Sequence, residues 1–399
     1  AATGPSASSD APGRAVDAVA RAADPATAMT RVLRKHTRQT GLLRDCFADP
    51  ALSDVYVTAP ATANPLRVRV DGETLETNVY LGAAGVDALA SRFRRESGRG
   101  FSRASPSLDA ATTVGDRRVR VAGVTEPVSD GQAFAFRAHD RDVWTLPALV
   151  GNGTMSASAA GLLSIAVERG AALLVAGPRG SGKTTLLGAL LWELPASVRT
   201  VCIEDAPELP IDTLQDDGRD VQGLRADDAG PLGPAEALRT ALRLGDGALV
   251  VGEVRGEEAA VLYEAMRVGA NSEAVLGTIH GDGAESVLER VVSDLGVPAS
   301  AFATTDLVVS LETAGPDGDQ RRVRTIEEVR DTDPMSFAPL FERDGTGLVA
   351  TGRIDRGNSR LVSTLTPPDE TYAETRTAVQ RRAGQLEGES VTARAGAGR

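Results

Sequence analysis

The spacing of apolar and polar residues predicts two kinds of region along the chain. Between residues 41 and 139, short alternating runs predict several strands and one helix, a pattern typical of a small α+β domain. The predicted strands are 54–58, 66–70, 118–121 and 133–137, and the predicted helix is 86–96. From 154 to 312, short continuous apolar runs alternate with stretches of helical period, which predicts a parallel sheet covered by helices.

The part of the chain after residue 312 again contains strand-like runs, with a hairpin through Asp344-Gly345 and a polar helix at about 370–386. At 399 residues the chain exceeds the roughly 250–300 residues that one hydrophobic core usually serves. The domains that we expect are a disordered tail at 1–27, an N-terminal α+β domain at 28–140, a linker at 141–153, a second α/β domain at 154–330, C-terminal strands and a helix at 331–388, and a tail at 389–399.

Residues 143–167 contain no charged side chain and are long enough to span a bilayer. Pro147 and two nearby glycines interrupt this segment, so we interpret it as a linker followed by a helix capped near Thr154 or Ser156. The N-terminal residues have no positively charged start and no apolar run of signal-peptide length. Both observations predict a soluble, cytoplasmic protein.

The ionisable residues give the chain a formal net charge of −12. Of the 43 basic residues only Lys35 and Lys183 are lysines, so arginine is the general cation of this chain. An acidic surface nearly free of lysine is typical of proteins from halophilic, salt-accumulating cells, where salt screens charge repulsion. The negative charge argues against nucleic acid as a partner. Cys46 and Cys202 are the only cysteines, which excludes a disulfide scaffold.

The sequence GPRGSGKT, which starts at Gly177, fits the pattern G-x-x-x-x-G-K-[ST] of a phosphate-binding loop. In such a loop, backbone N–H groups at the start of a helix surround the phosphates of a nucleotide. Lys183 is one of only two lysines, which indicates that a compact ammonium group is needed beside the phosphates. The residues expected to bind the nucleotide are Gly177, Pro178, Arg179, Gly180, Ser181, Gly182, Lys183, Thr184 and Thr185.

Three further predicted strands of the second domain end in residues suited to phosphate chemistry, namely Glu204, Glu253 and His280. A carboxylate after a strand is by itself more often a helix cap or part of a solvated turn. Because ligands bind at the carboxyl ends of parallel strands, however, these side chains are expected to converge on the phosphate-binding loop. We therefore expect a RecA-like P-loop NTPase domain with a mostly parallel sheet, preceded by the small α+β domain.

Hydrolysis of ATP requires charge neutralisation, an aligned water molecule and a bridging Mg²⁺ ion, so ATP and Mg²⁺ are the expected cofactors. Thr184 is expected to coordinate Mg²⁺ directly, and Glu253 through water, at a position where most such enzymes have an aspartate. Glu204 is the candidate to orient or deprotonate the attacking water. His280 is expected to donate a hydrogen bond to the γ-phosphate.

Four segments, in this order, resemble the ATPase superfamily that powers type II and type IV secretion, type IV pili and archaella. The similar segments are 177–185 for its Walker A motif, 202–209 for its aspartate box, 251–258 for its Walker B motif and 277–290 for its histidine box. Residues 54–58 and 120–137 resemble parts of its N-terminal domain. The resemblance implies a homohexameric ring with a mobile N-terminal domain. It also implies that the ring passes force to a polytopic inner-membrane platform protein, so we expect peripheral association with the inner face of the membrane.

The resemblance further implies that arginines of the N-terminal domain reach the nucleotide. Arg137 and either Arg120 or Arg118 match best by position. Arg243 matches a family arginine before the Walker B motif, and Arg239 lies one helical turn earlier. An arginine at the γ-phosphate can raise the rate of hydrolysis by about 10³–10⁵.

The sequence departs from the family pattern in several places. Gly245-Asp246-Gly247 stands where the family often has Arg-Pro-Asp, residues 210–234 match poorly and resemble an acidic loop, and residues 269–274 lack a Gly-His pair. The bacterial type II and pilus-extension branch has a zinc site of four cysteines, which two cysteines cannot supply. We therefore expect no zinc and a place nearer to the archaeal and type IV secretion motors.

Taken with the resemblance, the sequence predicts a Mg-dependent ATPase that powers assembly of a type IV pilus-like filament or protein secretion. Two alternatives stay open. One is a nucleotide-binding regulatory subunit with little turnover, which the changes at 245–247 and 210–234 favour. The other is a DNA-translocating ring, against which the net charge of −12 argues.

Overall fold

The computed structural model describes residues 41–397 except 116, 139–143, 228–229, 231, 269–273, 316–319 and 346. The tail predicted at 1–27 lies outside the described residues. The chain divides into two compact units, Ala1–Arg141 and Asp142–Arg399, and each unit has hydrophobic core of its own.

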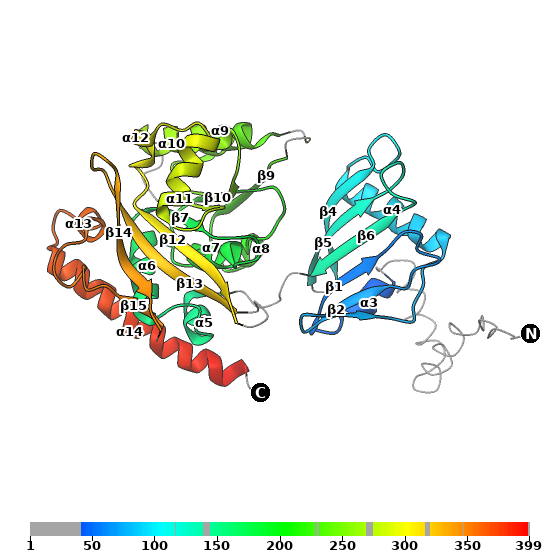
Figure 1. Ribbon diagram of the computed structural model, residues 1–399, viewed down its shortest axis with the longest axis horizontal. Helices are drawn as coiled ribbons and strands as arrows, with labels where there is room; N and C mark the ends of the chain where they lie inside the picture. The colour runs from blue at the N-terminus through cyan, green and yellow to red at the C-terminus, as the bar shows by residue number, and fades with distance from the viewer. Residues whose placement is uncertain are drawn as a thin grey trace, which may run out of the picture. The chain divides into compact units, whose positions relative to one another are not determined.

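The N-terminal unit contains a six-stranded antiparallel sheet, with α3 (Leu42–Phe47) and α4 (Ala83–Ser97) packed against it (Figure 1). The strands are β1 (Leu52–Val57), β2 (Arg67–Val70), β3 (Glu73–Glu76), β4 (Ser107–Val114), β5 (Arg117–Val124) and β6 (Ala133–Ala138), in the order β3-β2-β1-β6-β5-β4. The sequence analysis missed β3 and β4. All four residues of β3 are exposed, and β4 consists mostly of small and hydroxyl residues, so neither shows a clear alternation.

Aromatic packing closes the core of the N-terminal unit. Phe93 of α4 is fully buried, and its ring centroid lies 5.6 Å from that of Phe136 and 6.2 Å from that of Phe134, both on β6. Val119 and Val121 of β5 are buried beside them, because alternate residues of a strand face the same side of a sheet. The helix therefore packs on the apolar face that the alternating pattern predicts.

The C-terminal unit contains a nine-stranded mixed sheet. The strands are β7 (Ala172–Ala176), β8 (Thr200–Glu204), β9 (Val221–Arg225), β10 (Ala248–Val254), β11 (Val275–Ile279), β12 (Leu307–Ala314), β13 (Gln320–Arg330), β14 (Ser336–Arg343) and β15 (Leu348–Ala350), in the order β15-β14-β13-β12-β7-β11-β10-β8-β9. The neighbouring strands β12, β7, β11, β10, β8 and β9 run parallel to one another. The strands β12, β13, β14 and β15 pair antiparallel in that order. Every residue of β7, β8 and β11 is buried, as expected for parallel strands covered on both faces.

Helices cover both faces of this sheet, which confirms the predicted α/β fold class (Figure 1). The helices are α5 (Leu146–Gly151), α6 (Ala157–Glu168), α7 (Lys183–Leu191), α8 (Ile211–Asp216), α9 (Pro234–Leu244), α10 (Glu258–Val268), α11 (Ala284–Glu289) with a π-helical turn η1 (Arg290–Asp294), α12 (Ala299–Phe302), α13 (Arg360–Thr364) and α14 (Tyr372–Ala397). One core lies under α5, α6, α7 and α14, and the other lies under α9 to α12.

The uncharged segment at 143–167 is mostly helical, so the linker predicted at 141–153 is wrong for its second half. Helix α5 occupies 146–151, because the Thr145 side chain caps its N-terminus and Pro147 is tolerated in a first turn. Helix α6 begins after Ser156, whose hydroxyl accepts a hydrogen bond from the Ala159 N–H, as the capping prediction requires. Among the described residues, no helix is long and apolar enough to cross a membrane.

The C-terminal residues belong to the same unit rather than forming a separate segment at 331–388. Strands β14 and β15 extend the central sheet through the predicted hairpin, and α14 packs along α6. Gly161 allows this close approach, since a Cβ there would lie 2.7 Å from the Ala383 backbone nitrogen. The tail predicted at 389–399 is helical as far as Ala397, because its alanine, arginine and glutamate residues favour a helix. The loop predicted at 210–234 likewise contains α8 and β9.

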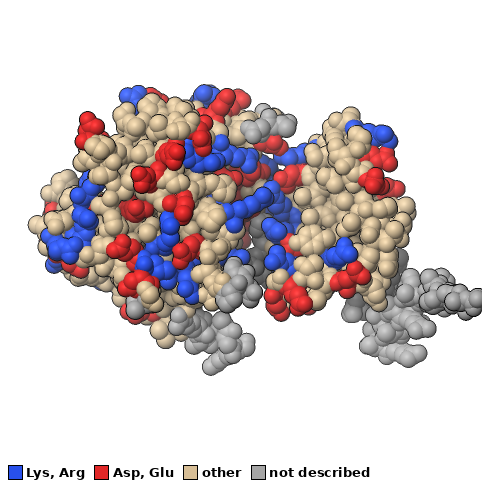
Figure 2. Space-filling view, viewed as in Figure 1, with Lys and Arg blue, Asp and Glu red and all other residues tan. Residues whose placement is uncertain are grey.

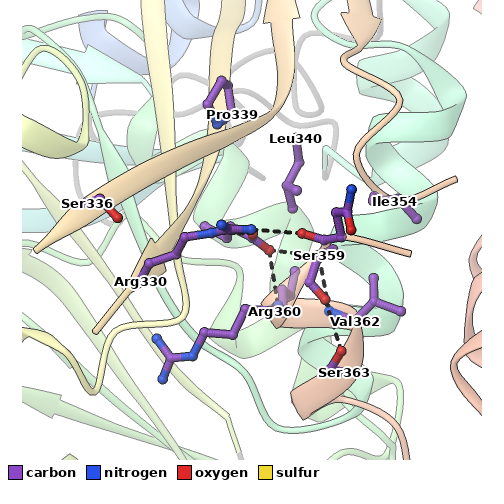
Figure 3. A network of polar contacts seen from close by, with 12 residues as sticks. Arg330, Ser336, Pro339, Leu340, Ile354, Ser359, Arg360, Val362 and Ser363 are labelled. Atoms are coloured by element: carbon purple, nitrogen blue, oxygen red, sulfur yellow. Dashed lines mark hydrogen bonds and ion pairs between the residues drawn. The ribbon is translucent and has the colours of Figure 1, made fainter. Parts of the chain in front are cut away.

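A buried carboxylate attaches the C-terminal segment to the sheet. Glu328 of β13 is fully buried, and its Oε2 accepts hydrogen bonds from the Ser359 hydroxyl (2.7 Å) and from the Leu361 N–H (3.1 Å). Its Oε1 accepts from the Arg330 guanidinium at 2.7 Å. Figure 3 shows Ser359 and Arg330 in this network of polar contacts. Because a buried charge needs such partners, this contact fixes the start of α13 on the sheet.

Candidate functional site

The phosphate-binding loop joins β7 to α7 and depends on its glycines for its shape. Gly182, the residue before α7, has φ +92°, in the left-handed region that glycine adopts without strain. Gly177 has φ +156°, and a Cβ there would lie 2.9 Å from the Leu311 carbonyl oxygen of β12. The loop therefore turns closely against β12 and leads the backbone into the N-terminus of α7, an arrangement suited to bind phosphate groups.

Lys183 begins α7, and its residue is 8% exposed. Its Nζ donates hydrogen bonds to the carbonyl oxygens of Gly177 and Pro178, each at 3.0 Å. Burial lowers the pKa of Lys183, whereas the negative charges of Glu253 and Glu208 raise it. The ammonium group thus lies inside the loop, within the field of two carboxylates.

The other loop residues differ in exposure. Ser181 is buried and donates a hydrogen bond from its hydroxyl to the Pro178 carbonyl oxygen (2.9 Å), which holds the loop closed. Thr184 and Thr185 are half-buried in the first turn of α7, and Arg179 is exposed at the tip of the loop. These positions agree with a loop that presents backbone N–H groups, with Thr184 near the place where a cation would accompany phosphates.

The Nε2 of His280 lies 2.9 Å from the Oε1 of Glu253. The pairing of β10 with β11 is irregular between Val251 and Val254, and such a bulge changes the direction of the side chains within it. Arg255 lies on the other side of the Glu253 carboxylate at 3.8 Å and bonds to Asp205 at 3.1 Å. The structure therefore joins residues of the predicted aspartate box, Walker B motif and histidine box.

Glu204 is the last residue of β8, and its side chain binds the backbone of the loop that follows. Its residue is 8% exposed, and its Oε1 accepts hydrogen bonds from the backbone N–H groups of Glu208 (2.8 Å) and Leu209 (2.7 Å). These bonds fix the loop that follows β8. The role of Glu204 as the base remains a prediction, and the occupied Oε1 makes it a poorer candidate than an exposed carboxylate.

Glu208 is a candidate that the sequence analysis did not single out. Its side chain is exposed, it follows the loop that Glu204 fixes, and its charge raises the pKa of Lys183. The signal in the sequence was the second glutamate of the aspartate-box segment, four residues after the first. The structure thus gives the aspartate-box segment a second, exposed glutamate whose charge acts on Lys183.

The predicted arginines of the N-terminal unit have carboxylate partners within that unit. Arg120 and Arg137 lie directly opposite each other on β5 and β6. Arg137 pairs with Asp54 at 2.9 Å, and Arg120 pairs with Asp109 at 3.0 Å. Hydrogen bonding to Asp54 raises the pKa of Arg137. Contact of these arginines, or of Arg118 on the same strand, with a nucleotide stays a prediction.

The segment before the Walker B strand explains one departure from the family pattern. Arg239 and Arg243 lie on α9, which ends at Leu244. A Cβ on Gly247 would lie 1.8 Å from the carbonyl oxygen of Arg199, the residue before β8, so only glycine fits at this position. The change at 245–247 is therefore a packing feature that leaves the strand in register with β8.

The site fits a nucleotide and one Mg²⁺ ion better than it fits a metal held by protein ligands alone. Among the described residues, no cluster of three or more His, Cys, Asp or Glu side chains could hold a metal ion. Mg²⁺ is usually bound through few protein ligands together with phosphate oxygens and water. Thr184 and Glu253 would be its protein partners, and the ion would supply positive charge at the phosphates.

Comparisons with known proteins agree with this geometry. A family model described as "Type II/IV secretion system protein" matches residues 41–328. A putative conjugal transfer protein of Mycobacterium tuberculosis is 33% identical over 273 residues, which cover 65% of this chain and 74% of that protein. An uncharacterized protein of Methanocaldococcus jannaschii is 27% identical over 333 residues, which cover 81% of this chain and 59% of that protein. The structure of the Legionella pneumophila ATPase DotB resembles the fold, with a TM-score of 0.56, 17% identity and 86% coverage of both chains.

Proposed function

Because the chain belongs to the type II/IV secretion system family of ATPases, we propose that it is a ring-shaped motor that hydrolyses Mg-ATP. The motor powers protein secretion or the assembly of a type IV pilus-like filament, through a membrane platform protein. The observation that carries the proposal is the convergence on Lys183: the ammonium group lies in the phosphate-binding loop, and its pKa responds to both Glu253 and Glu208.

The residues divide the work of hydrolysis. Backbone N–H groups of the loop and Lys183 would bind the β- and γ-phosphates. Thr184 and Glu253 would hold Mg²⁺, which would supply positive charge at the phosphates. His280, oriented by its contact with Glu253, donates to the γ-phosphate. Arg120 and Arg137 would supply positive charge at the nucleotide, as the family resemblance implies.

We propose Glu208 as the group that orients or deprotonates the attacking water, in place of Glu204. Glu208 is exposed and lies in the electrostatic field of Lys183, whereas Glu204 uses Oε1 to bind two backbone N–H groups. A general base must reach the water near the γ-phosphate, and the exposed Glu208 carboxylate is supported for this role by its effect on the pKa of Lys183. Glu204 is then a positioning residue.

Nucleic acid is not supported as the cargo. On the face shown in Figure 2, arginines and carboxylates are interspersed over both units rather than gathered into a basic surface. With a net charge of −12, the chain lacks the overall positive field that favours binding to a phosphate backbone. Proteins that act on single strands combine a basic groove with aromatic stacking, and aromatic residues make up only 4% of this chain.

The proposal is tested with the full chain in two steps. Phosphate release from ATP is measured with Mg²⁺ and with EDTA, at low salt and in molar KCl, because the acidic composition favours salt. Electron microscopy with ATP should show six-fold rings, and purification from the source membrane should yield a polytopic membrane protein. ADP binding without turnover in any of these conditions would support a regulatory subunit, and recovery of DNA alone would support a DNA-translocating ring.

A further inference from the structure

The loop that follows His280 is held by a strand that does not neighbour its own. Strand β11 ends at Ile279, His280 comes next, and α11 begins at Ala284. We call residues 281–284 the histidine loop. In the sheet, β12 and β7 lie between β13 and β11, yet two side chains of β13 contact the histidine loop. The contacts therefore join segments that the pairing of the strands leaves apart.

The two β13 side chains are Arg324 and Glu327. The Nη2 of Arg324 lies 2.8 Å from the Oδ1 of Asp282, and the Oε2 of Glu327 accepts a hydrogen bond from the Ala284 N–H at 3.1 Å. Gly283, between them, has φ +103°. A Cβ there would lie 3.3 Å from the Nη2 of Arg324 and 3.7 Å from the Oε2 of Glu327. Three consecutive loop residues thus lie against these two side chains.

A β-bulge directs Arg324 to the loop. Neighbouring residues of β12 stand opposite Val323 and Thr325, so Arg324 is an extra residue of β13 at this point. Val323 and Ile326 lie in the same hydrophobic cluster, although residues three apart in a regular strand face opposite sides of the sheet. The extra residue accounts for this. Bulges of this kind redirect side chains and are common beside active sites.

The contact between Arg324 and Asp282 is too exposed to contribute much to stability. The Asp282 side chain is 77% exposed, and the Arg324 side chain is 34% exposed. Such pairs add little to the free energy of unfolding, because water already solvates both charges. The loop that they hold starts directly after His280, whose Nε2 lies 2.9 Å from the Oε1 of Glu253. The effect of the contact is therefore expected in the orientation of the His280 ring.

We infer that Arg324 and Glu327 are positioning residues for His280. They hold residues 282–284 by a side chain and a backbone N–H group, and so keep the imidazole beside Glu253. They act through the loop and need no contact with the nucleotide. For its consequence on turnover, this inference rests on the proposed role of His280 at the γ-phosphate.

The orientation of His280 can be followed without turnover. The chain contains three histidines, so isotope-labelled histidine gives three imidazole NMR signals, and His280→Asn identifies the signal of His280. Arg324→Met and Glu327→Met should each shift that signal. Arg324→Lys and Glu327→Gln, which keep a donor and an acceptor, should leave it near its original position. Arg322→Met is the matched control on the same strand and should leave it unchanged, because Arg322 bonds to Gln320.

Phosphate release measures the consequence for turnover. Arg324→Met should lower kcat about threefold, the size of one exposed ion pair. Glu327→Met should lower it about tenfold, the size of a hydrogen bond to a charged group. The dissociation constant of ADP should stay the same, since ADP has no γ-phosphate. When His280 is already replaced by asparagine, neither change should lower kcat further, because the residue that they position is absent.

Three results would each overturn the inference. They are an unchanged His280 signal in both methionine variants, equal losses of kcat with and without His280, and a loss of ADP affinity, which would mean a distorted phosphate-binding loop. Asp282→Ala, at an exposed position, should shift the signal as Arg324→Met does and tests the same contact if the β13 variants do not fold. If the unaltered chain did not hydrolyse ATP while the signal still depended on β13, the proposed function would fail and the inference would stand.

Discussion

The two sides of β7 are built in different ways. On one side, the parallel strands β11, β10 and β8 lead to His280, Glu253 and Glu208, and side-chain contacts of Glu253 and Arg255 join the three segments. On the other side, the antiparallel pair β12 and β13 packs against the loop through Leu311 and Arg321. The first side brings charged groups together for chemistry, and the second gives the loop a firm support. Changes to the first side, or to the β13 residues that hold its histidine loop, should therefore alter turnover, and other changes to the second side should alter binding or stability.

The largest effect is expected at the centre, where both sides meet. Lys183→Ala removes the ammonium group that neutralises the phosphates, so phosphate release should fall by about 10³. Lys183→Arg is the matched control for charge and should be almost as inactive, because a guanidinium does not fit the space between the Gly177 and Pro178 carbonyl groups. Either variant with more than a tenth of the normal turnover would contradict this description of the loop.

The two carboxylates of the aspartate box should differ next. Glu208→Gln should lower kcat by about 10²–10³ and leave binding of an ATP analogue unchanged, because it removes the proposed base. Glu204→Gln keeps an oxygen that can accept from the Glu208 and Leu209 N–H groups, so kcat should fall less than about tenfold. Steady-state phosphate release measures both. The reverse order of effects would assign the base to Glu204.

A smaller loss of turnover is expected when the contact between Glu253 of β10 and His280, the residue after β11, is removed. His280→Asn removes the partner of Glu253 and the proposed donor to the γ-phosphate, so kcat should fall by about 10-fold to 100-fold. Affinity for an ATP analogue should fall while affinity for ADP stays the same, since only the analogue has a γ-phosphate. Calorimetric titration of both ligands measures this difference. An equal change in both affinities would show that His280 acts only on the structure of the loop.

Turnover should change least at the far end of β13. Glu328→Ala leaves Arg330, the Ser359 hydroxyl and the Leu361 N–H without their buried acceptor, which should cost about 3 kcal/mol of stability. The fraction that remains folded should hydrolyse ATP within about twofold of the normal rate. The reason is that the Glu328 carboxylate bonds to Arg330, Ser359 and Leu361, none of which belongs to the proposed site. Thermal unfolding and phosphate release at low temperature measure the two quantities. Glu328→Gln, which keeps the shape, should lose less stability.

The same comparison explains what the sequence could and could not predict. On the parallel side, short sequence patterns are enough to predict where the site residues lie. These patterns are a glycine-rich loop after a strand and charged residues at the ends of strands. The antiparallel side depends on pairs distant in sequence, such as Arg321 with Gly180, and no local pattern separates Arg321 from the other 40 arginines of the chain.

The misplaced elements have a similar origin. Helix α14 contains Gly384 and Gly388 and is polar on much of its surface, so the sequence does not mark a sharp end for it. Glu204 and Glu208 have the same side chain and lie four residues apart, and only the bonds of Glu204 to the backbone show which of them is held in place. The end of the helix and the role of each glutamate depend on contacts in the folded chain. No pattern in a single sequence predicts those contacts.

The most direct test places one variant from each side in the same measurement. For Glu208→Gln and Arg321→Gln, kcat is measured by phosphate release and the dissociation constant of ADP by titration, each beside the unaltered chain. A division of labour across β7 predicts opposite results. Glu208→Gln loses turnover and keeps ADP affinity, whereas Arg321→Gln, which removes the bond from β13 to the Gly180 carbonyl group, loses ADP affinity and keeps turnover. If both variants lost turnover and affinity together, the two sides of the loop would act as one, and the division would be wrong.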